Sequence, residues 1–192
     1  FFEACQRIFE TDGYFAPAYY TDGEPVATDT AWRQDRPPMR LMDAAAVLFI
    51  FCQFVTSRVG VERSRQLYQP VATKVATFLT DNWDNPAADD DAAFVWRLSR
   101  AALEQASELA QQHNDPANAV RWRTCADDIS AQLAGRDADE VTMDAVYAAY
   151  MFGVEGEAER TKQLVSQAVQ TLAAVDGLFK RRADDPNSSV VA

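Results

Sequence analysis

The segment "DAAFVWRLSRAALEQASELAQQHNDPANAVRWRTCADDISAQLAG", residues 91–135, decides the fold class of this chain. Its apolar residues recur every three to four positions over two long stretches, as they do on one face of a helix. In the short polar connection between the stretches, Asp115 suits the N-cap position and Pro116 suits the first position of a following helix. The sequence therefore predicts helices over 91–113 and 117–135 that lie antiparallel as a hairpin.

Helical periodicity continues on both sides of this hairpin. The stretch from Met42 to Arg58 is apolar nearly all round, which predicts a helix that is buried on most sides. Residues 61–83 are amphipathic, and Pro70 should kink or divide that helix. No strand-like alternation persists, so we expect one all-α domain over residues 1–192 with about seven helices, the others spanning 1–9, 139–153 and 157–177.

Two sets of side chains in the hairpin should lie in its core. Val120, Cys125, Ile129 and Leu133 share one face of the second helix and are expected to be buried. Trp96 and Trp122 stand among apolar helix residues and are expected in the core as well.

Charge and composition exclude several classes of partner. The net charge of −11 argues against binding to nucleic acid or to an anionic membrane surface, both of which attract basic patches. No apolar run approaches the roughly 20 residues of a transmembrane helix. The chain opens on "FFEACQRIFE", which resembles the end of a helix already under way. We therefore expect a piece of a longer protein, or a homo-oligomer.

The reactive side chains do not form a recognisable metal or cofactor motif. Cys5, Cys52 and Cys125 are far apart, and His113 is the single histidine. The seven glycines are scattered and form no phosphate-binding loop. We expect no metal and no cofactor, with buried, reduced thiols in a cytoplasmic protein.

The order of the helices suggests two layers. Nearly all-apolar helices (41–58 and 139–153) alternate with amphipathic ones (61–83 and 157–177). Inner helices shielded by outer helices produce this pattern, and a toroid of helical hairpins is one architecture of that kind. Seven helices cannot close a ring of six hairpins, so we expect missing segments, a partner chain, or an exposed apolar edge along 41–58 and 139–153.

Several segments resemble the glucoamylase-like glycoside hydrolases of family 15 in content and order. They cover nearly the whole chain, although each motif is degenerate. The segments are "DGYFAPAYYTDGEPV" (12–26), "RPPMRLMDAAAVLFIFCQF" (36–54), "VERSRQLYQPVATKVATFL" (61–79), "FVWRLSRAALEQASELAQQHNDPANAVRWRTCADDISAQL" (94–133) and "DEVTMDAVYAAYMFGV" (139–154). The resemblance implies an (α/α)6 toroid that acts on or binds α-linked glucose oligosaccharides or polysaccharides, a role in carbohydrate metabolism.

The resemblance also implies where sugar would bind. In such toroids, long loops at the ends of the inner helices line a central pocket, where aromatic rings stack on a pyranose and polar side chains bind its hydroxyls. Residues 11–33 form a stretch rich in aromatic residues, which we call the aromatic loop. This loop would then provide the platform, or its rings pin the loop onto the helices. Asp43 would face the pocket or cap its helix. The candidate substrate-binding residues are Tyr14, Tyr19, Tyr20 and Trp32, with Asp22, Asp29, Asp35, Arg36 and Asp43 as polar contacts.

Catalytic residues are not evident, so their identity stays unknown. Inverting hydrolysis needs a general acid and a base, but the acid loop of the family is replaced here by "TDNWDNPAADDDAAF", which contains no Glu. Trp83–Asp84 is the part of this segment most similar to the acid loop of the family. Asp89 to Asp91 either substitute for the acid or form a charged segment before the next helix. The resemblance places the base beyond Ala192 and a sugar-binding Arg–Asp pair before Phe1. A non-catalytic sugar-binding or regulatory toroid and a helical protein-interaction scaffold are the alternatives.

Overall fold

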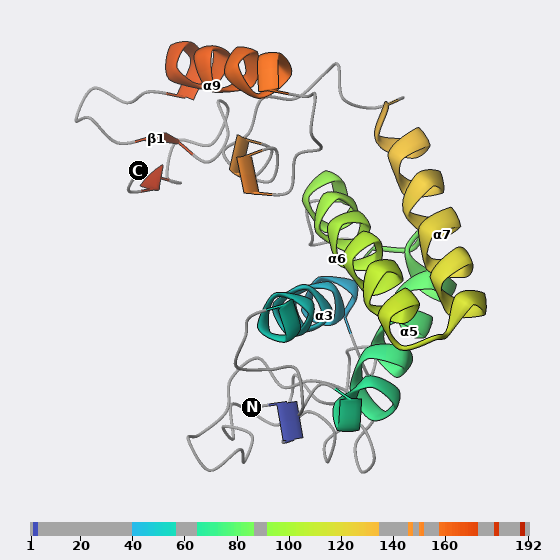
Figure 1. Ribbon diagram of the computed structural model, residues 1–192. Helices are drawn as coiled ribbons and strands as arrows, with labels where there is room; N and C mark the ends of the chain where they lie inside the picture. The colour runs from blue at the N-terminus through green and yellow to red at the C-terminus, as the bar shows by residue number, and fades with distance from the viewer. Residues whose placement is uncertain are drawn as a thin grey trace.

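The residues that the computed structural model describes are almost all helical (Figure 1). The residues described are 2–3, 40–56, 65–86, 92–134, 146–147, 150–151, 158–172, 179–180 and 189–190. The elements are α3 (Leu41–Thr56), η1 (Tyr68–Thr73), α5 (Lys74–Asn82), α6 (Ala92–Gln112), α7 (Pro116–Ala134), α9 (Ala158–Leu172), β1 (Phe179–Lys180) and β2 (Ser189–Val190). The predicted all-α class is confirmed, and the incomplete toroid of helical hairpins stays a prediction.

One short antiparallel pair departs from the helical pattern. β1 and β2 are two residues each, with Phe179 opposite Val190 and Lys180 opposite Ser189. The sequence analysis did not predict this pair, because period-2 alternation cannot be recognised over two residues.

Helix α6 is the central helix of the described core. It packs against α7 and against α3, and Figure 1 shows it between them. Every residue from Val95 to Leu103 is buried, which requires neighbours on several sides. The central position of α6 could not be predicted from the sequence. Arg97, Ser99 and Arg100 suggest a solvent-facing side of this helix, although all three are buried.

The hairpin of α6 and α7 forms as the sequence predicted. Asn114 adopts the left-handed conformation with φ 55°. Its N–H donates to the Gln111 carbonyl at 3.1 Å, and the Asp115 N–H donates to the Ala110 carbonyl at 2.9 Å, the pattern of a Schellman motif. Asp115 Oδ1 then accepts from the Asn118 N–H at 3.3 Å, which confirms Asp115 as the N-cap of α7.

The buried face of α7 contains the predicted Cys125, Ile129 and Leu133, but it does not contain Val120. Trp122 is fully buried, as predicted, whereas Val120 is 67% exposed, so its expected burial was wrong. At about 100° per residue, Val120 lies about 140° around the helix from Cys125 and cannot share its face. The residues that are buried are Ala119, Trp122, Cys125, Ala126, Ile129 and Leu133.

Pro70 changes the geometry of its helix, and residues 65–82 stay helical on both sides of it. It lies in η1, a π-helical segment between residues 65–67, which are helical, and α5. Proline has no N–H to donate, and a wider π-helical turn accommodates that lost hydrogen bond. Beyond this segment, α5 packs against α3, α6 and α7 through Val75, Ala76 and Leu79, all fully buried.

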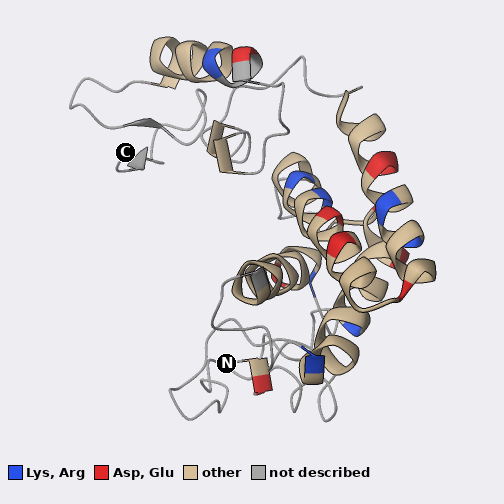
Figure 2. Cartoon of the chain, viewed as in Figure 1, with Lys and Arg blue, Asp and Glu red and all other residues tan. Residues whose placement is uncertain are grey.

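Charged side chains on the outer surface connect the helices. Arg121 of α7 pairs with Asp81 of α5 at 2.6 Å, and Arg123 pairs with Glu104 of α6 at 3.3 Å. Figure 2 shows both signs of charge along α6 and α7. Exposed pairs of this kind contribute about 0–1 kcal/mol each, so the apolar core provides most of the stability.

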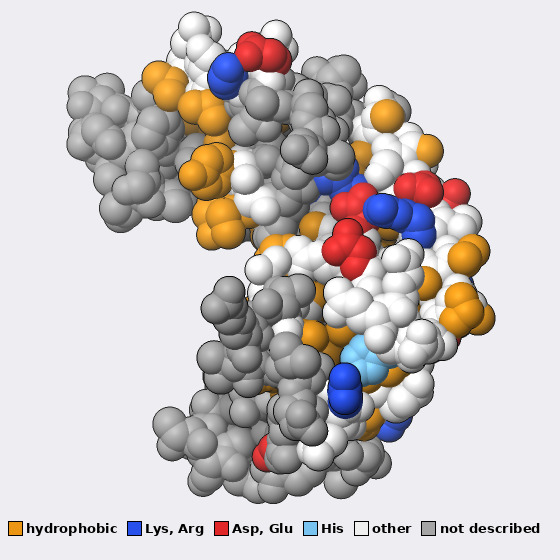
Figure 3. All heavy atoms as spheres, viewed as in Figure 1, with side chains coloured by type: hydrophobic (Ala, Val, Ile, Leu, Met, Phe, Trp, Pro, Cys, Tyr) orange, Lys and Arg blue, Asp and Glu red, His pale blue; other side chains and the backbone are white. Residues whose placement is uncertain are grey.

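Helix α9 lies apart from this core and contacts β1 (Figure 1). Ala168 and Leu172 are buried, but Val165 is 40% exposed and Val169 is 51% exposed. Figure 3 shows hydrophobic side chains gathered on this part of the molecule, beside a hollow in the surface.

The predicted exposed apolar edge is present in one of its two places. In the described part of 139–153, Tyr147, Tyr150 and Met151 are all exposed. On α3, large apolar exposure is confined to Ile50, because α5 and α6 cover the rest of that helix. Among the described helices, none combines the length and apolar character needed to cross a membrane.

Candidate functional site

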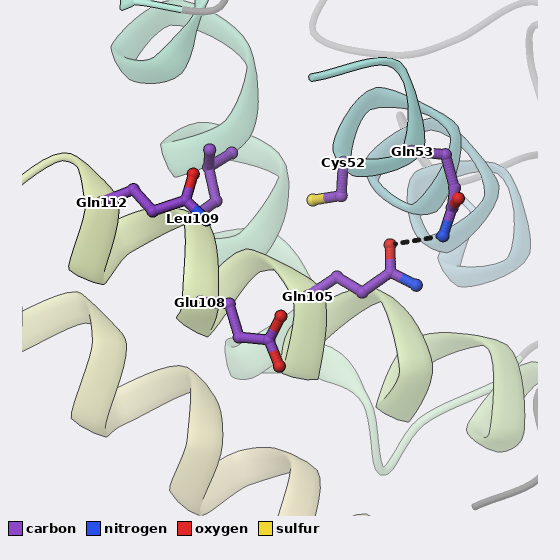
Figure 4. A pocket seen from close by; sticks show the side chains of 6 residues that line it. All are labelled: Cys52, Gln53, Gln105, Glu108, Leu109 and Gln112. Carbon is purple, nitrogen blue, oxygen red and sulfur yellow. Dashed lines mark hydrogen bonds between the residues drawn. The ribbon is translucent and has the colours of Figure 1, made fainter. Parts of the chain in front are cut away.

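A surface pocket of about 200 Å³ lies between α3 and α6 (Figure 4). Four of its residues come from α6 at positions i, i+3, i+4 and i+7, a spacing that places them on one side of the helix. Two neighbouring residues near the C-terminal end of α3 complete it. We call it the amide pocket, and its residues are Cys52, Gln53, Gln105, Glu108, Leu109 and Gln112.

Four of the six residues that line the amide pocket carry a hydrogen-bonding amide or carboxylate group. Gln53 Nε2 donates to Gln105 Oε1 at 3.1 Å and joins the two helices (Figure 4). Within the described part of the chain, no hydrogen bond or ion pair engages the Glu108 carboxylate or the Gln112 side-chain amide. These two groups are therefore available to a bound molecule.

The thiol of Cys52 forms an unreactive wall of the pocket. Burial raises the pKa of Cys52 to about 12, and the negative charge of Glu108 adds to the effect. The side chain is therefore a neutral thiol, neither a nucleophile nor a metal ligand at physiological pH. Among the described residues, no group of three or more His, Cys, Asp or Glu side chains is placed to hold a metal ion.

A second polar cluster joins η1 to the turn between α6 and α7. The Tyr68 hydroxyl donates to Asp115 Oδ2 at 3.0 Å, and the His113 ring stacks on the Tyr68 ring with centroids 4.2 Å apart. The rings are nearly parallel, at 7°.

The protonation states of this cluster are fixed near neutral pH. Burial raises the pKa of Tyr68 and lowers the pKa of His113, while the hydrogen bond from the Asn118 side chain lowers the pKa of Asp115. Tyrosine and histidine are thus neutral, and aspartate is ionised. No group here is poised for proton transfer at pH 7, so the cluster is a structural junction.

The described candidates for a catalytic acid do not have the setting that such an acid requires. Trp96 Nε1 donates to the Trp83 carbonyl at 2.8 Å, and the two rings pack edge to face with their centroids 6.4 Å apart. Trp83 therefore packs against the core. Asp84 is exposed, whereas a carboxyl acid of this type is usually enclosed in apolar surroundings. Asp89 to Asp91 lie outside the described residues.

The structure locates one of the predicted sugar contacts. Asp43 is half-buried in the first turn of α3, where the helix dipole favours a carboxylate. It is nine positions from Cys52, away from the amide pocket, and its contact with sugar stays a prediction. Tyr14, Tyr19, Tyr20, Trp32, Asp22, Asp29, Asp35 and Arg36 lie outside the described residues.

The sequence analysis missed the amide pocket. The positions of Gln105, Glu108 and Gln112 were readable as a polar stripe on the 91–113 helix. Such a stripe is also what any solvent-facing side of a helix shows, so it carried no signal of a site. Only the packing of α3 beside α6 turns the stripe into one wall of a pocket.

Comparison of the chain with protein-family models, with curated proteins and with solved structures found no match.

Proposed function

We propose that this chain is part of an (α/α) toroid of the glucoamylase-like family 15 type and binds α-linked glucose oligosaccharides in the cytoplasm. The observation that carries the proposal is the helical hairpin of α6 and α7, with α3 packed against α6. These helices contain two of the segments that resemble the family, and they follow one another in its order. Hairpins of this kind are the units from which such toroids are built.

The proposed role is binding rather than complete hydrolysis. An inverting enzyme needs two carboxyl groups roughly 6.5–9.5 Å apart, one of them a general acid in a setting that raises its pKa. Of the described candidates, Asp84 is exposed.

Calorimetric titration of the chain with maltotriose tests this proposal. Stacking of an aromatic ring on a pyranose buries apolar surface worth about 1.5–3 kcal/mol, so Tyr19→Ala and Trp32→Ala should each weaken binding about tenfold or more. Tyr150→Ala is the matched control, because Tyr150 is an exposed aromatic residue outside that loop. Maltotriose that does not bind, or that binds all variants equally, would overturn the proposal.

The exposed apolar side chains favour a second candidate function, a helical scaffold that assembles with a second copy of itself. Tyr147, Tyr150, Met151, Val165 and Val169 are each at least 40% exposed. An exposed apolar group of this kind often marks an interface. Sedimentation equilibrium would then show a dimer that Tyr150→Lys and Val169→Lys convert to a monomer. A monomer at all concentrations would exclude this candidate.

A further inference from the structure

We propose that the amide pocket binds a small, uncharged, polyhydroxylated molecule of about the size of one sugar ring. The residues that line the pocket come from α3 and α6, and the inference does not depend on the toroid proposal. It follows from the kinds of groups that line the pocket, from its volume, and from the charge balance of its walls.

The lining groups match hydroxyls in their hydrogen-bonding capacity. Gln53, Gln105 and Gln112 contribute carboxamides, each of which has both donor and acceptor atoms, and Glu108 contributes acceptors. A hydroxyl is likewise one donor and two acceptors. A ligand with several hydroxyls can therefore donate to Glu108 and accept from Gln105 Nε2 and Gln112 Nε2 at once. Leu109 provides an apolar surface for the carbon-bound hydrogens of such a molecule.

The charge of the walls excludes the other small-ligand classes. An anion would face Glu108 in a chain of net charge −11. A metal ion would find a single carboxylate and a neutral thiol at Cys52, and an ammonium group, which can only donate, would leave the amide N–H groups without acceptors. A purely apolar ligand would leave the Glu108 carboxylate and the Gln112 amide without partners as it displaced their water, at a cost of about 1–3 kcal/mol for each group.

The volume sets the size of the ligand. Pockets for drug-sized ligands run from about 300 to 1,000 Å³, and the amide pocket, at about 200 Å³, is smaller. The Gln53–Gln105 hydrogen bond spans the gap between α3 and α6 and holds two of the amides in place before the ligand arrives. A single ring or a short linear polyol fits these limits.

Titration of the ¹⁵N-labelled chain with glucose tests the inference at the site itself. The side-chain amide signals of Gln53, Gln105 and Gln112 should shift along one saturable curve. Gln105→Met and Gln112→Met keep the side-chain shape but remove the amide, and each should weaken glucose binding about threefold to tenfold. Gln111→Met is the matched control, because Gln111 is exposed on α6 next to the pocket but does not line it.

Two further variants separate this inference from its competitors. Glu108→Gln should bind glucose within about threefold of the wild-type chain, since the oxygen acceptor remains and the ligand is neutral. Trp32→Ala should leave the amide shifts unchanged, whatever its effect on maltotriose. Amide signals that do not respond to glucose, Gln→Met variants that bind as tightly as wild type, or putrescine that binds more tightly than glucose and only with Glu108 intact would each overturn the inference.

Discussion

Asp115 stabilises the helical hairpin in two ways, so we expect Asp115→Ala to be costly. Its Oδ1 caps α7 through the Asn118 N–H, and its Oδ2 accepts from the buried Tyr68 hydroxyl. Loss of an N-cap costs about 1 kcal/mol, and a buried hydroxyl left without an acceptor costs about 1–3 kcal/mol. The free energy of unfolding should fall by about 2–4 kcal/mol in total.

Urea denaturation followed by circular dichroism measures this loss, and thermal unfolding checks it. At about 2–4 °C per kcal/mol for a chain of this length, Tm should fall by roughly 4–16 °C. Asp115→Asn keeps one of the two acceptor oxygens and should lose less than Asp115→Ala does. In a double-mutant cycle with Tyr68→Phe, the coupling should be about 1 kcal/mol or more. A loss below about 0.5 kcal/mol for Asp115→Ala would refute the reasoning.

The same carboxylate makes stability depend on acid pH. The Asn118 side chain lowers the pKa of Asp115 below its ordinary 3.8, so the unfolded state binds this proton more readily than the folded state does. The contribution of Asp115 is therefore complete above the unfolded pKa and is lost as pH falls through the folded pKa. Urea midpoints measured across this acid range should fall less steeply for Asp115→Asn than for the wild-type chain.

The remaining predictions concern the core, the hairpin turn and two titrating groups. Trp122→Ala should lower the free energy of unfolding by about 3–5 kcal/mol in urea denaturation, because Trp122 is fully buried. Asn114→Gly should raise it by a few tenths of a kcal/mol to about 1 kcal/mol, since φ is 55° there and glycine carries no side-chain penalty. The Cys52 thiol should resist iodoacetamide at pH 8 in the folded chain and react in urea, as its raised pKa of about 12 and its burial require. Burial lowers the pKa of His113 below 6.5, so the wild-type free energy of unfolding should decline as pH falls from 7.5 to about 5.5, and His113→Gln should reduce that decline.

Local signals in the sequence were sufficient for the helices and for the turn between α6 and α7. Asp115 and Pro116 mark the start of α7, and both positions depend only on neighbouring residues. Pro70 marked the π-helical segment in its helix for the same reason, because a missing N–H acts within one turn.

Features that depend on distant residues were not predictable in this way. Arg97 and Arg100 of α6 are charged and would be predicted to lie on the surface. Both are buried, because other parts of the fold cover them. Val120 of α7 was predicted to be buried, but its neighbour Ala119 is buried instead. Several apolar residues in this stretch allowed more than one assignment of the buried face. The amide pocket needs α3 and α6 together, and Gln53 is 52 positions from Gln105 in the chain.

A crystal structure of the 192-residue chain with maltotriose tests the central claim most directly. The account predicts that the helical hairpins follow the arc of a toroid and that the sugar stacks on Tyr19 and Trp32 at the ends of the inner helices. A structure in which the hairpins follow no such arc, or in which maltotriose binds away from these two rings, would contradict it.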